Sequence, residues 1–480
     1  MKTFVLRSGR KIPGSRDFVA SQGWLVPFLS SACLFAVLVG SNLLVGCGGG
    51  SASTTPQPSA NSSGGGSSGS NSSAALLVSL GEYASVQGQI VALELSVDSV
   101  TLRSSSGDVA LLSTPRRIEV GRLKAEPLLL GHAPQGKYSG IAIAVSNPEI
   151  SYFDAGGVLH ENVAGSLTSS NATNSSAFSL DSTPTAVDLN LLLPVDFSGN
   201  AVSVTPAFNF STRGGRTSNL VGRVTTVGSN SFALDIGNGT FTFATDPNTT
   251  FQGLNGLSGL SAGMTVEVDA AFGSDGIFRA TQVGLENNLP SAELAEGLAY
   301  TTSLAQMQVV VREVHVPAGV ALPEVGKALS VAANASTQFA FSNGADLNNL
   351  DFTPSFDALT IARGQNLRIS TTNGSAATFT ADQLKLEEQS LDGIAGAVGA
   401  GSVSGQFTFP INLDANSAFA QLTGQTSVLV TVQPSTEKFL YLGSENCVPC
   451  IAGGTVRVRG LLFFSGGQYR LVAEWLAVTS

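Results

Sequence analysis

The sequence has few of the residue types from which active sites are usually built. It contains three histidines, four cysteines and two tryptophans among 480 residues, and 12% of its residues are charged. None of the histidines, His132, His160 and His315, has a serine, an aspartate or a second histidine at a spacing typical of a catalytic triad or a metal site. The G-x-S-x-G, H-E-x-x-H, phosphate-loop and dinucleotide-binding motifs are also missing from a supporting context. We therefore expect no catalytic residue, no metal and no cofactor.

Basic residues are outnumbered as well. The chain has 24 lysines and arginines against 34 aspartates and glutamates, a formal charge of −10. Removal of residues 1–46 leaves 19 basic and 33 acidic residues, so the remaining chain carries a charge of −14. Because nucleic-acid binding needs a basic surface, this balance argues against a nucleic-acid partner.

Pairs of acidic residues are the remaining candidates for hydrolytic chemistry, since glycoside hydrolysis uses two carboxyl groups that flank one bond. The closest pairs are Glu293 with Glu296 and Glu387 with Glu388. Glu387 and Glu388 are adjacent, so on a strand their side chains point to opposite faces. Glu293 and Glu296 lie in an expected linker. We expect all four side chains to be exposed and solvated.

The N-terminal residues indicate export. Five basic residues precede Trp24–Val45, an uncharged run rich in Leu, Val, Phe and Ala, and this run ends at Gly46-Cys47. The segment resembles the signal peptides of bacterial lipoproteins, which implies cleavage between Gly46 and Cys47 and a lipid on the Cys47 thiol. The alternative is an uncleaved membrane helix, because the run is close to the roughly 20 residues that span a bilayer. Both alternatives place the rest of the chain outside the cytoplasm, at a cell membrane or an outer membrane.

The four cysteines have separate expected roles. Cys33 leaves with the signal peptide and Cys47 carries lipid, so Cys447 and Cys450 remain to pair, and an oxidising envelope favours a disulfide between them. Cys-Val-Pro-Cys is also the form of a thioredoxin-like redox centre, but the flanking residues indicate strand and turn rather than the start of a helix. A zinc half-site would require two further ligands. The disulfide is preferred, and the redox and metal alternatives stay open.

The first folded region is expected to be a β-sandwich. Residues 47–74 are the lipidated cysteine and a Gly/Ser-rich flexible linker, whereas in 75–211 apolar residues alternate with others between turn signals. The motifs Gly136-Lys137-Tyr138 and Leu191–Phe197 give this region a resemblance to an uncharacterised domain family of bacterial lipoproteins. The resemblance implies a transthyretin-like or related β-sandwich with no assigned reaction.

A different pattern begins at residue 220. In 220–288 the order is G-x-V, two strands, T-x-F, L-x-x-G-x-x-V-x-V, a turn and A-x-x-V, with Gly222 as the opening glycine. The layout resembles a second uncharacterised family, a small closed β-barrel. The same order recurs in 294–388 and 391–480, opened by Gly297 and Gly393. This implies three barrels similar to the five-stranded oligonucleotide- and oligosaccharide-binding folds, although a shared barrel plan does not identify a ligand.

The sequence thus predicts an all-β protein: a transthyretin-like β-sandwich and three small OB-like β-barrel repeats behind the signal peptide, 1–46. We expect a noncatalytic, lipid-anchored envelope protein that binds the membrane through Cys47 and an unidentified envelope protein or polysaccharide. One alternative is an envelope enzyme or redox protein with a site assembled between domains, in which Cys447 and Cys450 are the only redox candidates. Another is a carbohydrate or peptide binder; its few candidate aromatic side chains include Tyr469 and Trp475, which we expect in the core or at a rim.

The Cys447–Cys450 pair gives a first testable prediction. If it is a structural disulfide, replacing both cysteines with serine lowers stability only modestly, because the closed loop is short. Neither thiol should then be reactive as a thiolate well below the ordinary pKa of about 8.5. The alkylation rate of the reduced protein as a function of pH measures this, and a strongly lowered thiol pKa would contradict the noncatalytic interpretation.

Overall fold

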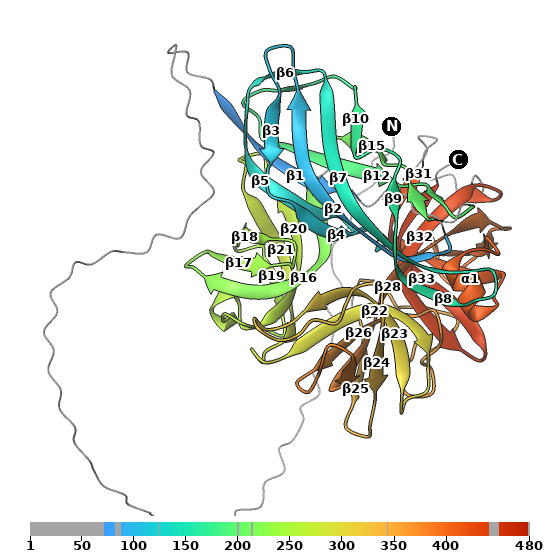
Figure 1. The fold of residues 1–480 in the computed structure, drawn as a ribbon. Coiled ribbons are helices and arrows are strands. Elements are labelled where there is room, and N and C mark those ends of the chain that lie inside the picture. Colours follow the sequence, from blue (N-terminus) through green and yellow to red (C-terminus); the bar gives the residue numbers. More distant parts are fainter. Residues whose placement is uncertain are drawn as a thin grey trace, which may run out of the picture. The chain divides into compact units, whose positions relative to one another are not determined.

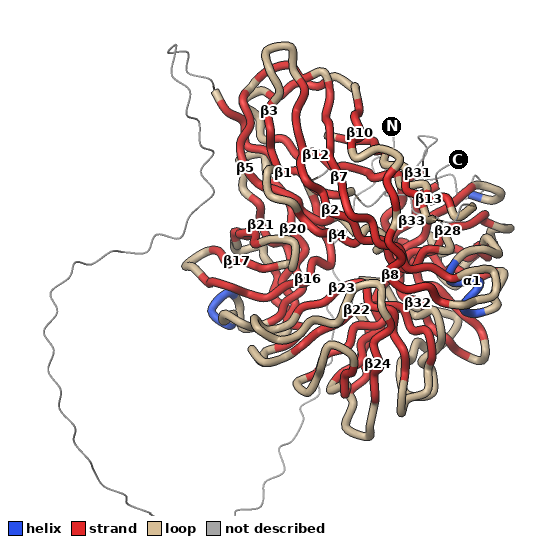
Figure 2. The backbone as a smooth tube through the Cα atoms, viewed as in Figure 1, coloured by secondary structure: helices blue, strands red, loops and turns tan. Residues whose placement is uncertain are grey.

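The computed structural model describes residues 72–81, 88–122, 124–198, 201–212, 215–342, 344–440 and 451–478. All of them belong to one compact unit of the chain, Gly69–Ser480. This unit is nearly all β-strand, and Figure 2 shows helix only in short segments between strands. The all-β prediction is confirmed. None of the helices in these ranges has the length and apolar character needed to cross a membrane.

The first two sheets enclose one core. One has the strand order β15-β12-β1-β5; the other has the order β10-β7-β2-β3, with β4 beside β2 and β8 beside β7. Their strands are β1 (Ser73–Leu80), β5 (Glu126–Pro134), β12 (Thr185–Leu192), β15 (Ala207–Ser211), β2 (Ile90–Arg103), β3 (Val109–Leu112), β4 (Arg116–Glu119), β7 (Gly140–Phe153), β8 (Leu159–Ala164) and β10 (Asn171–Asn174). Short pairings add β6 (Gly136–Tyr138), β9 (Ser166–Leu167), β11 (Phe178–Leu180), β13 (Val195–Asp196) and β14 (Ser203–Val204). The long arrows of β2 and β7 run side by side in Figure 1.

Alternation along β1 explains how this sandwich is attached to the next part of the chain. Leu76, Val78 and Leu80 belong to the core between the two sheets. Leu77 points to the opposite face, as the two-residue period of a strand requires, and belongs to the core of the following sheet together with Ala186. The sheet of β1 and β12 is therefore covered on both faces: one face is apolar, and the other combines Leu77 and Ala186 with the hydrogen-bonded pair Ser79 and Asp188.

The six-stranded sheet that follows the sandwich closes on itself, because its first and last parts also pair with each other. It contains β16 (Arg216–Val227), β17 (Ser231–Asp235), β18 (Thr240–Ala244), β19 (Thr250–Gln252), β20 (Thr265–Phe272) and β21 (Phe278–Asn287), with a 3-10 helix at Leu257–Gly259. The order is β18-β17-β16-β20-β21-β19, and β18 also pairs with β21. The path from β16 through β17, β18, β21 and β20 thus returns to β16. We call this the first closed sheet.

The remaining strands form one 12-stranded sheet with two such closures. Its elements are β22 (Glu293–Thr301), β23 (Met307–His315), β24 (Ala328–Ala332), β25 (Gln338–Phe341), β26 (Asn366–Thr371), β27 (Thr378–Thr380), β28 (Gln383–Ala395), β29 (Gly399–Ala400), β30 (Phe407–Leu413), α1 (Ala418–Thr423), β31 (Ser427–Leu440), β32 (Thr455–Ser465) and β33 (Gln468–Val478). In the second closed sheet β24 pairs with β27, which continues after two residues into β28. In the third, β30 pairs with both β28 and β31, and β31 pairs with β33.

Strand β28 belongs to both of these closures. Its first part pairs with β26 as far as Glu387, and its second part pairs with β32 from Glu388 onward. The boundary expected between 388 and 391 therefore falls inside a continuous strand.

A buried threonine occupies the same place in each closed sheet. Thr249, Thr337 and Thr436 donate from Oγ1 to the carbonyls of Ala280, Ala381 and Ala473 at 2.8, 2.8 and 2.7 Å. Each hydroxyl also accepts from the backbone N–H three residues earlier, at 3.0, 2.9 and 2.9 Å. The hydroxyl thus satisfies two backbone groups, just before β19 and β25 begin and at the irregularity within β31 between Val432 and Glu437.

The opening glycines have a common steric reason. A Cβ at Gly222, Gly297 or Gly393 would collide with a carbonyl oxygen of the paired strand, that of Asp235, Val310 or Asn412 respectively. Only glycine allows the two backbones to approach so closely.

The threonines give a second prediction. Thr249→Val, Thr337→Val and Thr436→Val should each lower the free energy of unfolding by about 1–3 kcal/mol, because each leaves a buried carbonyl without its donor, and Thr436→Val also leaves the buried N–H of Gln433 without its acceptor. Thr→Ser should restore most of the loss. The exposed neighbour Thr250 provides the control, since Thr250→Val leaves the buried bonds of Thr249 in place. Urea titration measures the differences, and a full-sized loss in Thr250→Val would contradict the assignment.

Candidate functional site

Many strands carry charged side chains on the face that points away from the apolar core of their own sheet. These side chains meet one another where the sheets pack together. On β28, for example, Leu384 and Leu386 belong to the core of the second closed sheet, whereas Lys385 and Glu387 face outward. We call the resulting set of buried ion pairs the junction network. Its members are Glu119, Arg122, Lys124, Glu126, Glu267, Glu286, Glu296, Glu313, His315, Arg368, Lys385, Glu387, Glu388, Arg459 and Glu474.

Arg368, whose side chain is 2% exposed, lies at the centre of the network. Its Nη1 atom contacts carboxylate oxygens of Glu267 at 2.7 Å, Glu286 at 3.0 Å and Glu387 at 2.9 Å. Its Nη2 atom contacts Glu296 at 3.0 Å. Glu267 and Glu286 come from β20 and β21, so this residue of β26 joins the first closed sheet to the second.

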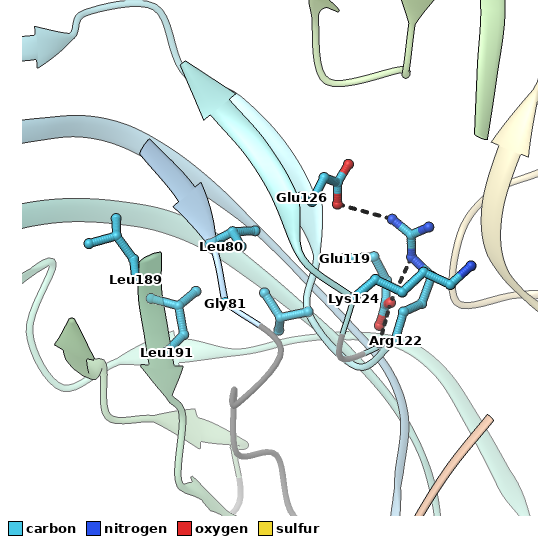
Figure 3. A pocket seen from close by; sticks show the side chains of 9 residues that line it. Leu80, Gly81, Glu119, Arg122, Lys124, Glu126, Leu189 and Leu191 are labelled. Atoms are coloured by element: carbon cyan, nitrogen blue, oxygen red, sulfur yellow. Dashed lines mark hydrogen bonds and ion pairs between the residues drawn. The ribbon is translucent and has the colours of Figure 1, made fainter. Parts of the chain in front are cut away.

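The sandwich is joined to the second closed sheet by a similar group. Lys124 lies 3.2 Å from Glu296, and Arg122 forms ion pairs with Glu313 and with Glu126, the latter at 3.1 Å. Glu119 accepts hydrogen bonds from the backbone N–H groups of Leu93, Gly121 and Arg122, which fixes the turn that carries Arg122. Figure 3 shows Arg122 linked to both Glu119 and Glu126 at a pocket lined by leucines. At about 10 Å³ this pocket has room for roughly one water molecule.

Glu388 links the third closed sheet to the first. This carboxylate accepts from Asn219 Nδ2 at 2.7 Å and lies 3.7 Å from Arg459 Nε, which is also 3.5 Å from Glu474. Glu387 and Glu388 therefore contact different partners, as their adjacent positions on a strand predict.

The expectation that Glu293, Glu296, Glu387 and Glu388 are solvated is wrong. These residues are only 6%, 1%, 1% and 4% exposed. The linker expected at Glu293 and Glu296 is also wrong, because both residues lie on β22 (Glu293–Thr301), and all four side chains are covered where the sheets pack together.

Burial and charge act in opposite directions on the acidic members. Burial raises the pKa of Glu387 to about 8 and holds the pKa of Glu388 well above its ordinary range. For Glu296 burial acts in the same direction, but Lys124 and Arg368 outweigh it and lower the pKa to about 2. At neutral pH Glu296 is therefore a carboxylate, whereas Glu387 is protonated although Arg368 and Lys385 lie beside it, because burial outweighs the attraction of these cations.

Three of the carboxylates lie close enough to hold a metal ion. Oxygen atoms of Glu267, Glu286 and Glu387 are all within 4.8 Å of one another. The same three side chains surround Arg368 Nη1, and Lys385 Nζ lies 2.7 Å from Glu286 and 3.3 Å from Glu387. Because two protein cations already occupy the space among these oxygens, the arrangement fits an ion-pair cluster rather than a metal site.

A larger pocket lies beside the network. It has a volume of about 550 Å³, within the range of small-molecule sites. Its walls come from the sandwich (Ile90, Val91, Gly121), the second closed sheet (Leu298, Arg312), β28 and the third closed sheet (Leu413, Phe419, Thr455). We call it the junction pocket.

Arg312 differs from the other arginines at the junction. Its Nη2 donates to the carbonyl oxygen of Gly121, and no carboxylate of the described residues lies within 4.0 Å of it. Its buried Nε has no hydrogen-bond partner among the described residues, a property that it shares with Arg122 and Arg368. Burial lowers its pKa more than Glu119 and Glu296 raise it.

The other residues singled out in the sequence are dispersed. His132 is exposed on β5, His160 lies 3.0 Å from Asp154, and the buried His315 lies 2.9 Å from Glu313 in the network. Tyr469 and Trp475 are 8% and 3% exposed, so of the two expected places, core or rim, both residues take the core. Gly46, Cys47, Cys447 and Cys450 lie outside the described residues.

Comparison with known proteins identifies one region. Residues 221–284 match a family described as a domain of unknown function, DUF5666, which confirms the expected uncharacterised domain in the first closed sheet. No curated protein matches the chain. Among solved structures, the chain shows 14% identity to a multidomain protein with nucleic acid binding domains from Streptococcus pneumoniae TIGR4, over 54% of this chain and 72% of that one. The TM-score is 0.11, too low for a structural or functional argument.

The raised pKa of Glu387 gives a third prediction. Its carboxyl titrates near 4.5 in the unfolded chain and near 8 in the folded protein, so the folded state holds a proton that the unfolded state releases. The stabilisation is complete below about pH 4.5 and is lost as the pH rises through 8. Between pH 6 and pH 9 this group should cost about 3 kcal/mol of stability.

Glu387→Gln should remove this part of the alkaline loss, because the amide mimics the protonated carboxyl and never ionises. Urea titrations at pH 6 and pH 9 provide the measurement, with the exposed Glu437→Gln as the matched control. An equal alkaline loss in Glu387→Gln and the unchanged protein would show that Glu387 is not the responsible group.

Proposed function

We propose that this chain is an exported, lipid-anchored and noncatalytic envelope protein that acts as a binding module. Its anchor is the lipid on Cys47 behind a cleaved signal peptide, and its folded part consists of a β-sandwich followed by three repeats of one small β-barrel domain. The observation that carries the binding role is the junction pocket, which has the volume of a ligand site and walls from the sandwich and from two closed sheets.

Three independent correspondences support the repeat organisation. The strand pairings close in the same order in each unit. The three opening glycines face a carbonyl of the paired strand. The three buried threonines make equivalent pairs of hydrogen bonds. A common ancestor unit explains all of these together, because no single one of them is needed to form a closed sheet.

The junction network supports binding by a fixed structure. Buried ion pairs require definite geometry, since a charge that loses its partner in a dry interior is strongly destabilising. The strands around the pocket are therefore held at set distances, which reduces the conformational entropy that a ligand must overcome.

The anchor gives a fourth prediction. Cys47→Ser should abolish incorporation of labelled fatty acid and leave the precursor with its N-terminal segment, because the thiol is the attachment point and lipid transfer precedes cleavage. Cys33→Ser is the matched control, since Cys33 lies within 1–46 and is removed with the signal. Metabolic labelling followed by gel analysis measures both variants. Normal labelling of Cys47→Ser would contradict lipidation at this residue.

A further inference from the structure

Within the described ranges, Arg312 is a half-buried cation without a carboxylate partner, in a region where the neighbouring cations each have at least one. Arg122, Lys124, Arg368, Lys385 and Arg459 all form ion pairs. Arg312 makes one hydrogen bond, from Nη2 to Gly121, although a guanidinium has five N–H donors. A charge in this position costs free energy unless an anion compensates it.

Arg312 lies where an anion that is not part of the chain could reach its guanidinium and balance its charge. The residue lines the junction pocket, and it also lines a smaller cavity of about 20 Å³ beside Arg122 and Lys124. The smaller cavity has space for no more than about one water molecule, whereas the junction pocket at about 550 Å³ accommodates an organic molecule. The anion that pairs with Arg312 would therefore enter from the junction pocket.

The rest of the pocket indicates what the anion is attached to. Apolar side chains of Ile90, Val91, Leu298, Leu391 and Phe419 line it. Ile394, also in the lining, is 45% exposed, which is unusual for a large aliphatic residue on a strand of a packed sheet. A ligand with an apolar body would cover this side chain.

The acidic residues in the lining limit the charge of the ligand. Asp392 and Asp414 are both present, and Asp392 is paired with Arg457 at 2.7 Å. Arg457 balances the charge of Asp392, so Asp414 is the carboxylate that would repel a nucleotide or another polyanion, whereas one carboxylate at Arg312 adds a single negative charge beside a single compensating cation.

We propose that the junction pocket binds a small monocarboxylate with an apolar body, and that Arg312 pairs with its carboxylate. This inference rests on the proposed binding function and specifies its ligand class. A guanidinium presents parallel N–H groups that match a carboxylate, and Ile394 and its apolar neighbours cover the body.

The test uses a carboxylate and a neutral amide of the same shape. Full-length protein in lipid nanodiscs is titrated with 4-phenylbutyrate and with 4-phenylbutanamide, and binding is followed by calorimetry with empty nanodiscs as the blank. We expect saturable binding of the carboxylate and at least about tenfold weaker binding of the amide, because a charge-assisted hydrogen bond is lost.

Two variants separate the parts of the site. Arg312→Gln should bind the two ligands equally, whereas Arg279→Gln, which changes an exposed arginine paired with Asp275, should keep the preference for the carboxylate. Ile394→Asp should weaken both ligands, and because Ile394 is half exposed this variant should retain the thermal midpoint of the unchanged protein. The comparison of the two ligands on the unchanged protein remains decisive if Arg312→Gln does not fold.

Three outcomes would overturn the proposal: no saturable binding of 4-phenylbutyrate at millimolar concentration, equal affinity for the amide, or a preference for the carboxylate that survives in Arg312→Gln. Equal affinity for both ligands, weakened by Ile394→Asp, would leave a binding module with a different ligand class. Carboxylate binding together with normal labelling of Cys47→Ser would retain the pocket and refute the anchor.

Discussion

The ion pairs of Arg368 are the interaction on which the arrangement of the sheets depends. Removing a guanidinium from water costs several kcal/mol, and the cost is offset only when carboxylates surround it with good geometry. Its four carboxylates come from β20, β21, β22 and β28. A slip of one residue in the register of β26 would turn Arg368 into the apolar core in place of Leu367 and Ile369 and bring one of these apolar residues to the glutamates. The cluster thus specifies both the register within one closed sheet and the packing of another against it.

Apolar contacts supply most of the driving force for packing the sheets together, but they specify the relative placement of the sheets less than the ion pairs do. A small core made of Val91, Phe153, Leu298, Val310, Ala418 and Leu422 joins the sandwich, the second closed sheet and α1. Apolar burial is non-directional, so such a core tolerates several relative placements. The ion pairs of Arg122 and Lys124 at the same junction tolerate few, because a displaced partner leaves a buried charge uncompensated. Because the ion pairs fix how the sheets are placed, β28 can pass from the second closed sheet into the third without a linker between them.

The sequence predicts the strands and the inner faces well, and the outer faces poorly. Alternation and the opening glycines locate the closed sheets, and the T-x-F motif marks Thr249 and Thr337. It misses Thr436, because the third copy reads Thr436-Glu437-Lys438-Phe439 and has one additional residue before the phenylalanine. The junction network is missed for a physical reason: an outward-facing charge looks the same in a sequence whether water or another sheet covers it. The available signal was the charge pattern, since Glu267, Arg368 and Lys385 alternate with core residues and carry both signs.

Arg312 and Arg368 show how one residue type serves two purposes in one junction. Arg368 contacts four glutamate side chains, and these contacts hold strands of different sheets together. Arg312 lies on β23, two strands away in the same sheet, and is held by a single backbone carbonyl while the ion pairs around it fix its surroundings. The carboxylates of Glu119 and Glu296 cannot turn toward it, because Glu119 is bound to three backbone N–H groups and Glu296 to Lys124 and Arg368. The network therefore does more than stabilise the fold: by engaging the nearby acids it keeps one guanidinium available to the pocket.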